Sequence, residues 1–478
     1  MKKISNYING QLVAPSSRQY MDLYDPSTGS VYAQVPESDL ADVESAVAAA
    51  EKAFEKWSAT SVGERSQIMT KIADLIDVNL EKLAVAESLD NGKPVWLAKK
   101  VDIPRASSNM RFFAQAITQF STSAHEMTSA INYTLREPLG VVGTISPWNL
   151  PLYLFTWKVA PALAAGNCVI AKPSEVTPMT AYLLSELCIE AGLPAGVFNI
   201  VHGDGLNVGE EISKHPKIKA ISFTGSTRVG AEIAKVAAPV FKKVSLEMGG
   251  KNPNIIFADC DYDKMLKTTL HSSFANQGQI CLCGSRIFVE RPIYEKFKKD
   301  FISRTAALKV GHPSDDKVNQ GAIVSKPHYD KILSYIHLAK EEGGKILTGG
   351  TAIHPLGYEN GWYIAPTIIE GLPHNCRTNQ EEIFGPVVTI MPFDTEDEVL
   401  TYANSTVYGL SSTVWTENLS RANRMAKKIH AGIVWINTWL LRDLRTPFGG
   451  VKNSGVGREG GFEALRFFTE PKNVCIEY

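Results

Sequence analysis

One short segment of the chain sets a cysteine in surroundings suited to nucleophilic chemistry. Residues 273–286 read SFANQGQICLCGSR and place Cys281 among glycine and amide side chains, with little aliphatic bulk. A structural cysteine is usually packed among aliphatic side chains, whereas a nucleophilic one needs polar, partly open surroundings that keep its thiolate accessible. The segment therefore favours a reactive Cys281 over a merely buried one.

Two further polar residues would complete a set for acyl transfer. Glu247 precedes two glycines in LEMGGKNP (246–253), and Asn149 lies between a tryptophan and a proline-bounded turn in ISPWNLP (145–151). In such a set a thiolate attacks a carbonyl, an amide N–H stabilises the oxyanion, and a carboxylate activates the water that cleaves the thioester. Taken singly, Glu247 could be a surface acid and Asn149 a turn residue.

Seven motifs in order resemble the aldehyde dehydrogenase superfamily, and the likeness extends from YING at 7–10 to GVGRE at 455–459. The motifs are PWN (147–149), AKPSE (171–175), FTGS (223–226), LEMGGK (246–251), GQIC (278–281), EEIFGPV (381–387) and PFGG (447–450). The resemblance implies an α/β fold with two doubly wound open parallel domains and a small bridging β element. It also implies NAD-dependent oxidation of an aldehyde to a carboxylic acid through a cysteine thiohemiacetal and a thioester.

The resemblance assigns the catalytic roles. Cys281 is the nucleophile, Asn149 and the Cys281 backbone N–H hold the oxyanion, and Glu247 is the base that activates water. Cys283 is interpreted as a neighbour, because the family motif puts the reactive thiol directly after GQI. Lys158 would order the water or Glu247. An equally weighted alternative is a surface lysine whose aliphatic side chain is buried while its ammonium group reaches solvent.

One departure concerns the carboxyl end. Where some relatives carry a carboxylate as an additional proton relay, the stretch GREGGFEALRFF aligns Phe462, with Glu463 adjacent. We therefore assign no role to such a relay in this chain.

The turn FTGSTRVG (223–230) is suited to a phosphate group. The chain lacks a GxGxxG motif, since HGDGLNVG (202–209) has its last glycine one residue late, and it lacks a Walker A motif. Gly225 lets the backbone approach a phosphate, and Ser226 with the helix N-terminus donates hydrogen bonds. Standing alone, the turn would be interpreted as an ordinary helix N-cap.

The resemblance assigns the cofactor contacts to Trp148, Lys172, Glu175, Gly225, Ser226, Glu382 and Phe384. A carboxylate at Glu175 accepts hydrogen bonds from free ribose hydroxyls and repels a 2′-phosphate, which favours NAD over NADP. Lys172 leaves some room for NADP. From the sequence alone, the alternative of a core position for Phe384 and a helix-surface position for Glu382 is favoured.

Two arginines suggest an acidic substrate. Arg442 lies in NTWLLRDLRTPFGG (437–450), a loop that lines the substrate entrance in relatives, and Arg105 precedes a helical run that would project into the same tunnel. A guanidinium presents a planar fork suited to bidentate carboxylate binding, so the pair would orient a semialdehyde that carries a carboxylate. Arg111, six residues beyond Arg105, is interpreted as structural.

The segments WNLPLYLFTWK (148–158), FANQGQICLCGSR (274–286) and WLLRDLRTPFGG (439–450) are similar to those of 2-aminomuconate and 2-hydroxymuconate semialdehyde dehydrogenases. The alternatives are salt bridges of Arg442 and Arg445 with Asp443, and another specificity, for betaine aldehyde, succinate semialdehyde, or aliphatic and aromatic aldehydes.

Other classes fit the residues less well. A non-catalytic relative would tend to lose the thiol or the base, and the retained Glu247 argues against a dehydrogenase that passes its acyl group to coenzyme A. A cysteine hydrolase would need a histidine partner, and none of the ten histidines lies in a recognisable catalytic motif.

The elements that position these residues alternate between helix and strand. Apolar spacing predicts helices over 42–57 and 63–90, with Glu64 near a helix start. Short apolar runs predict two series of strands, at 140–145, 167–173, 197–203, 220–225 and 243–250, then at 254–257, 286–290, 387–393, 411–416 and 432–437. Strands alternating with helices are typical of parallel α/β sheets.

The two series predict two packed domains with a hinge near residues 249–250. We expect an NAD-binding domain over 1–120 and 139–249 and a catalytic domain over 250–455. The resemblance adds a bridging element over 121–138 and 462–478 and implies a homodimer or homotetramer.

Composition narrows the partners. The 49 basic and 50 acidic residues argue against a nucleic-acid surface. The amino terminus lacks the apolar run of a secretory signal and no segment is long enough to cross a bilayer, so we expect a cytoplasmic protein without membrane contact. Seven irregularly spaced cysteines fit reduced thiols, and the CLC pair lacks a second pair of ligands, so no metal is expected.

Overall fold

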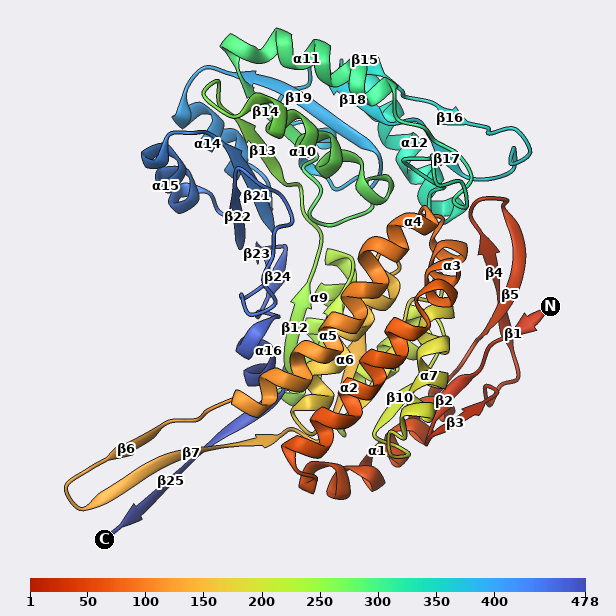
Figure 1. Ribbon diagram of the computed structural model, residues 1–478, viewed down its shortest axis with the longest axis vertical. Coiled ribbons are helices and arrows are strands. Elements are labelled where there is room, and N and C mark those ends of the chain that lie inside the picture. Colours follow the sequence, from red (N-terminus) through yellow and green to blue (C-terminus); the bar gives the residue numbers. More distant parts are fainter.

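The computed structural model describes residues 1–478 and contains two open, mainly parallel sheets flanked by helices (Figure 1). The first sheet has the strand order β24-β12-β11-β8-β9-β10-β2-β3. Its five parallel strands match those predicted and are β8 (Val141–Ile145), β9 (Cys168–Lys172), β10 (Phe198–Ile200), β11 (Ile218–Thr224) and β12 (Lys243–Glu247). The predicted α/β fold class is therefore confirmed.

The chain order of the first sheet reverses beside β8. From β8 the chain adds β9 and β10 on one side and then β11 and β12 on the other. Ligands of open α/β sheets bind at the carboxyl ends of strands where the order reverses. Asn149 follows β8, Ser226 follows β11 and Glu247 ends β12, so the topology gathers three predicted site residues at one edge.

Three outer strands of this sheet, all antiparallel to their neighbours, were not predicted. They are β2 (Asn6–Ile8), β3 (Gln11–Val13) and β24 (Gly455–Val456). The last comes from far along the chain and pairs antiparallel with β12, with Gly455 opposite Glu247. This pairing brings the segment around residue 455 to the end of the strand that carries the predicted base.

The second sheet has the order β15-β18-β19-β14-β13-β21-β22 and is parallel except for β15. Its strands are β13 (Pro253–Ile256), β14 (Arg286–Glu290), β15 (Lys345–Thr348), β18 (Thr367–Glu370), β19 (Val387–Phe393), β21 (Ser411–Trp415) and β22 (Ile433–Ile436). A separate sheet in the order β1-β5-β4 is formed by β1 (Lys2–Lys3), β4 (Tyr20–Asp25) and β5 (Ser30–Pro36).

The main helices connect these strands. They are α1 (Leu40–Ala59), α2 (Val62–Val78), α3 (Leu80–Asn91), α5 (Ile103–Ala116), α6 (Pro151–Ala164), α7 (Met179–Ala191), α9 (Thr227–Ala237), α10 (Tyr262–Phe274), α11 (Arg291–Ala306), α12 (Lys326–Glu341), α14 (Glu396–Asn404), α15 (Leu419–Lys428) and α16 (Gly461–Phe467). No helix combines the length and apolar character that crossing a membrane requires.

The start of α2 follows from local capping. The Ser61 hydroxyl accepts from the Glu64 N–H at 3.2 Å and the Glu64 carboxylate accepts from the Ser61 N–H at 2.8 Å, which satisfies two unpaired donors reciprocally. The predicted start near Glu64 is confirmed. The predicted continuous helix over 63–90 is wrong, because the chain breaks at Asn79 between α2 and α3.

A three-stranded arm projects from the body and contains the chain's carboxyl end (Figure 1). It consists of β6 (Ala124–Glu126), β7 (Ala130–Pro138) and β25 (Thr469–Glu477), all antiparallel. The range 121–138 lies in this arm, whereas the range 462–478 begins within helix α16, which packs against α5 and α6. The domain boundaries otherwise stay a prediction.

Candidate active site

The loop that carries Cys281 has a constrained backbone. Asn276 and Gln277 adopt left-handed conformations with φ of 51° and 57°, and Gly278 follows with φ of 70°. A β-carbon at Gly278 would meet the Gly385 carbonyl oxygen at 2.1 Å, so only glycine fits there. Non-glycine residues in the left-handed conformation are strained and persist only where the surrounding structure holds them. Such residues are concentrated at functional sites.

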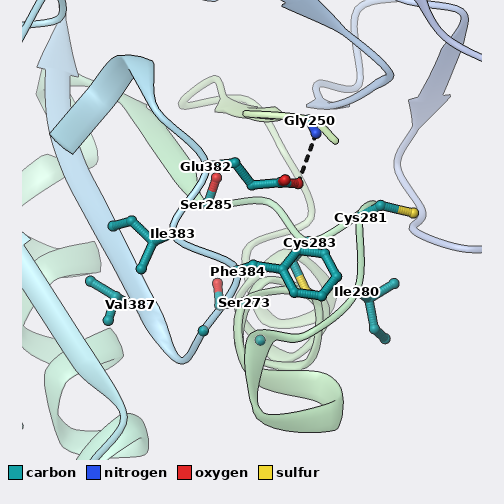
Figure 2. Close-up of a pocket in the computed structure, with 12 residues that line it drawn as sticks. Gly250, Ser273, Ile280, Cys281, Cys283, Ser285, Glu382, Ile383, Phe384 and Val387 are labelled. Atoms are coloured by element: carbon teal, nitrogen blue, oxygen red, sulfur yellow. Dashed lines mark hydrogen bonds between the residues drawn. The ribbon is translucent and has the colours of Figure 1, made fainter. Parts of the chain in front are cut away.

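The Cys281 side chain is half-buried, and its sulfur points away from the buried Cys283 (Figure 2). Burial raises the pKa of the Cys281 thiol well above its usual value, and the charges of Glu247 and Glu382 raise it further. The positive charge of Arg442 favours the thiolate and so lowers this pKa, against the effect of the two carboxylates. The surroundings are therefore less open than the sequence suggests, and the thiol is protonated at neutral pH until a base takes its proton.

The loop after β8 is held from several sides. The buried Asn149 donates from its side-chain amide to the Gln279 carbonyl oxygen at 3.0 Å. This contact fixes Asn149 against the Cys281 loop, two residues from the thiol. An amide nitrogen has two N–H groups, so the second remains available. The Cys281 backbone N–H likewise has no partner within the protein.

Glu247 lies in a buried carboxylate pair. Its Oε1 accepts from the Gly450 N–H at 3.2 Å. Burial and then the neighbouring Glu459 carboxylate raise the pKa of Glu247 to about 8, and Lys158 opposes this shift. A carboxyl group that titrates near neutral pH is suited to general-base work.

Lys158 is 1% exposed, so the alternative of a surface lysine is wrong. Its Nζ lies 2.5 Å from Glu459 Oε1 and 3.3 Å from Ser222 Oγ. Glu459 is itself buried and is held by paired backbone hydrogen bonds of 2.7 Å with Phe448. The Lys158–Glu459 pair therefore lies close enough to Glu247 for both charges to act on its carboxyl group.

A cavity of about 230 Å³ lies at the carboxyl edge of the first sheet and reaches Cys281. It is lined by polar and aromatic groups that include Trp148, Gly225, Ser226, Glu382 and Phe384. The rings of Trp148 and Phe384 meet edge to face with centroids 5.2 Å apart. Five of the seven predicted cofactor residues therefore line one cavity.

Glu382 is fixed by the glycine pair before Lys251. Its Oε1 accepts from the Gly250 N–H at 2.8 Å (Figure 2). A β-carbon at Gly249 would meet Glu382 Oε2 at 2.2 Å, so glycine is required for this approach. Phe384 adopts φ of 63°, a strained value for an aromatic residue. The alternative of a helix-surface position for Glu382 is wrong, because it lies outside the helices and lines two cavities.

Lys172 and Glu175, the other two predicted cofactor residues, do not line this cavity, and Glu175 lines a second cavity with Val324 and Lys326. Lys172 ends β9, is 3% exposed, and places its Nζ 3.0 Å from Glu175 Oε2. Ser226 is the N-cap of α9, where its hydroxyl accepts from the Val229 N–H at 3.3 Å. The N-cap and phosphate readings are compatible, because the hydroxyl is exposed at the cavity and the first N–H groups of α9 face the same side.

Arg105 and Arg442 lie against a group of aromatic side chains, Tyr153, Trp157 and Phe448, which we call the aromatic cradle. The Arg105 guanidinium carbon lies 5.8 Å and the Arg442 carbon 4.6 Å from the Trp157 ring centroid. Arg442 also lies 3.8 Å from the Phe448 ring and donates to the Tyr153 hydroxyl at 3.3 Å. On both arginines the Nε and Nη2 atoms are buried and have no hydrogen-bond partner. Buried donors normally find partners, so this concentration of positive charge is suited to an anion.

The neighbouring arginines behave differently. Arg445 pairs with Asp443 at 2.7 Å at the surface, and Arg442 forms no salt bridge. Arg111 pairs with Asp74 and Asp77, which confirms its structural interpretation. The alternative of a salt bridge to Asp443 is therefore correct for Arg445 and wrong for Arg442.

Known proteins share this architecture. The chain matches the aldehyde dehydrogenase family over residues 12–474. The chain belongs to the aldehyde dehydrogenase family. It is 50% identical to a 2-aminomuconic semialdehyde dehydrogenase of Danio rerio, over 99% of this chain and 98% of the relative. It is 47% identical to a 2-hydroxymuconic semialdehyde dehydrogenase of Pseudomonas sp. (strain CF600), over 100% of both chains. The structure of an aldehyde dehydrogenase from Bacillus cereus in complex with NAD⁺ superposes with a TM-score of 0.97 at 39% identity, over 100% of this chain and 97% of that one.

Sequence reasoning missed two residues of this aldehyde dehydrogenase site. The Glu459 carboxylate lies beside Lys158, three residues before the Phe462 position at which the sequence was compared with the relay of relatives, and Phe462 instead faces Phe120. The GRE triplet before the glycine pair was the available signal. His328, on α12, lies 4.9 Å from the Trp148 ring and its Nε2 lies 2.7 Å from the Phe384 carbonyl oxygen, and no sequence motif marks it.

Proposed function

We propose that this aldehyde dehydrogenase uses NAD to oxidise a semialdehyde that carries a carboxylate, of the 2-aminomuconate or 2-hydroxymuconate type, to the corresponding acid. The observation that carries the substrate class is the pair of half-buried arginines, Arg105 and Arg442, whose buried Nε and Nη2 atoms have no hydrogen-bond partner. Relatives named for 2-aminomuconic and 2-hydroxymuconic semialdehydes support the same choice.

The substrate carboxylate binds between Arg105 and Arg442. Both guanidinium groups offer free N–H donors from one aromatic cradle. Charge-assisted hydrogen bonds to a carboxylate are worth about 1.5–3 kcal/mol each. Holding this end of the substrate directs its aldehyde carbon toward the thiol, because Arg442 is close enough for its charge to act on Cys281.

The first chemical step forms a bond between sulfur and carbon. The Cys281 thiol gives its proton to the Glu247 carboxylate, whose raised pKa makes it a competent base. The thiolate then attacks the aldehyde carbon, and the carbonyl π electrons move to oxygen. The free N–H of the Asn149 amide and the Cys281 backbone N–H stabilise the oxyanion.

The cofactor cavity fits NAD. Ser226 and the first turn of α9 would hold the pyrophosphate, the Lys172–Glu175 pair would hold ribose hydroxyls, and Glu382 with Phe384, which share a cavity with Cys281, would hold the nicotinamide end. Bound NAD would supply the hydride acceptor, and loss of hydride from the tetrahedral carbon would leave a thioester on Cys281.

The second half of the reaction is hydrolysis. Glu247, after losing its first proton, takes a proton from water, and the oxygen attacks the thioester carbon. The carbon–sulfur bond breaks, the acid leaves and the Cys281 thiolate returns. The Lys158–Glu459 pair keeps a carboxylate beside Glu247, and this holds the pKa of Glu247 in the range where it titrates.

The test is NADH formation by the purified protein with NAD and a panel of aldehydes. The panel holds a muconate-type semialdehyde, succinate semialdehyde, and neutral aliphatic and aromatic aldehydes. We expect the highest kcat/KM with the muconate type. Faster turnover of neutral aldehydes would refute the acidic substrate class, and absence of any NADH would refute the dehydrogenase itself.

We also infer that the protein forms a homodimer or homotetramer through its arm. Both edges of the β25-β7-β6 sheet lack a neighbouring strand, and Met127, Leu135 and Ile476 are exposed on it. An exposed sheet edge with apolar side chains favours pairing with another chain. Sedimentation of the full chain, compared with a variant that ends before residue 470, would test this; a monomeric full chain would contradict it.

A further inference from the structure

A cluster of buried charges lies behind the loop that carries Asn149. Lys93, in the turn between α3 and α4 (Val95–Leu97), is 0% exposed. Its Nζ lies 2.7 Å from Asp102 Oδ1 and 3.6 Å from Glu87 Oε1, and both carboxylates are buried too. No motif assigned to the chemistry includes these residues.

The ammonium group also reaches the catalytic loop. Lys93 Nζ donates to the Asn149 backbone carbonyl at 3.2 Å. Amide groups of Asn276 and Asn91 donate to the same oxygen at 2.9 Å and 3.4 Å. Three donors from two segments, residues 91–93 and the loop at Asn276, converge on one carbonyl that has two lone pairs, so this peptide is held against rotation. The Asn149 side chain extends from that peptide toward Gln279.

Asp102 occupies an unusual stretch of helix. It ends a π-helical segment, Ala98–Asp102, in which the Ile103 N–H donates to Ala98 five residues earlier. Single π-turns of this kind are rare and often lie at functional sites. Asp102 and Arg105 are three residues apart, so both project from the same face of the continuing helix. The turn that directs Asp102 toward Lys93 therefore also directs Arg105 toward the substrate cradle.

The third member of the cluster contacts the helix that forms this cradle. Glu87 Oε2 accepts from the Leu152 N–H at 3.3 Å, in the first turn of α6. Helix α6 carries Tyr153 and Trp157, over which Arg105 and Arg442 lie. The cluster thus contacts the Asn149 loop and helix α6, and Asp102 itself is the N-cap residue of helix α5, which carries Arg105.

We propose that the Lys93–Asp102 pair is a positioning device that fixes the distance between the oxyanion donor Asn149 and the carboxylate anchor Arg105. The proposal rests on the proposed function, since it assigns the two ends of the substrate to these residues. Lys93 contacts neither substrate nor cofactor and acts through the Asn149 peptide. Asp102 acts by fixing the rotation of helix α5, which carries Arg105.

Stability alone gives a weak reason for this pair. Desolvating two charges is costly, and replacing a buried ion pair with apolar residues is often neutral or stabilising. Removing one partner, in contrast, leaves a buried charge unpaired and destabilises the fold. A double replacement therefore separates a structural role from a positioning role.

The experiment compares Lys93→Met, Lys93→Met/Asp102→Leu and Asp102→Asn with the wild-type protein. For each we would measure the unfolding midpoint, the KM for NAD, and kcat with one acidic and one neutral aldehyde. Positioning errors near 1 Å cost about 100-fold in rate, so we expect kcat to fall roughly 10- to 100-fold in both Lys93 variants. The KM for NAD should stay within about twofold, because the cluster does not line the cofactor cavity.

The double variant gives the decisive comparison. We expect it to regain the unfolding midpoint that Lys93→Met loses, without regaining turnover, and to lose part of the preference for the acidic aldehyde. Recovery of both stability and turnover would show a merely structural pair and overturn the proposal.

Asp102→Asn gives a second test that is independent of the double variant, because asparagine keeps an oxygen acceptor for Lys93. We expect its kcat to stay within about threefold of wild type, and a larger loss would contradict positioning through this contact. Wild-type protein that forms no NADH would refute the proposed function, whereas a double variant with wild-type turnover refutes only this inference.

Discussion

The cofactor end and the substrate end of the site differ in how their charges are paired. At the cofactor end, Lys172 pairs with Glu175 at 3.0 Å, and Glu382 accepts from the Gly250 N–H at 2.8 Å. At the substrate end, Arg105 and Arg442 keep buried donors without partners. The charged groups assigned to the cofactor pair with other protein groups, whereas the arginines assigned to the substrate keep N–H donors that a carboxylate could accept from.

This difference indicates where specificity lies. A site whose polar groups already satisfy one another accepts its ligand with little rearrangement. Buried guanidinium groups gain most from a carboxylate, because an unpaired buried donor is costly. Changes at the substrate end should therefore alter which aldehyde reacts, and changes at the cofactor end should alter only the use of NAD.

The largest effect should come from the thiol between the two ends. Cys281→Ala removes the nucleophile, and we expect kcat to fall at least about 10,000-fold with every aldehyde. NAD affinity, measured by a binding titration, should change little. Cys283→Ala is the matched control and should keep nearly full turnover; an equal loss there would mean that the reactive thiol is wrongly assigned.

The next effect should come from the oxyanion donor. Asn149→Ala should lower kcat roughly 100- to 1000-fold for acidic and neutral aldehydes alike, because it removes a donor needed only in the transition state. Steady-state rates with both substrates check this. Unchanged turnover would remove Asn149 from the mechanism.

The pH dependence should follow Glu247. Its carboxylate is the active form, and its pKa is raised to about 8, so kcat should fall as the pH falls below that value, by about tenfold per pH unit where hydrolysis limits the rate. Because Glu247 is the base in both half-reactions, Glu247→Gln should remove this dependence and slow NADH formation in the first turnover as well as in the steady state. Continued turnover of that variant at the wild-type rate would contradict the role of Glu247.

The smallest effect should come from the cofactor end. Glu382→Gln keeps the shape of the side chain and weakens its hydrogen bonding, so the KM for NAD should rise by only a few-fold. The ratio of kcat/KM between acidic and neutral aldehydes should not change. Glu381→Gln is the control, since Glu381 pairs with Arg377 outside the cavity. A changed ratio in Glu382→Gln would break the separation between the two ends.

The sequence predicted the parts of the site that lie in local motifs. Cys281, Glu247 and Asn149 stand beside glycine, amide and proline residues that the sequence displays directly, and the five parallel strands of the first sheet appear as apolar runs. The roles given to these three residues remain proposals.

The parts that were missed depend on distant contacts. Glu459 joins Lys158 across 301 positions of the chain, through the bridge to Phe448 and the β24 pairing. Lys93 and Asp102 look like ordinary surface charges until α3, α5 and α6 bury them. The break at Asn79 was also missed, because the apolar spacing continues across it.

The most direct test of the account compares Arg442→Ala with Arg445→Ala, which remove neighbouring arginines with different partners. We would measure kcat/KM for a muconate-type semialdehyde and for a neutral aldehyde of similar size. Arg442→Ala should lower the acidic value roughly 10- to 100-fold, as expected for a lost charge-assisted hydrogen bond, and leave the neutral value within about threefold. Arg445→Ala should change neither. Equal losses for both aldehydes in Arg442→Ala would contradict a carboxylate site.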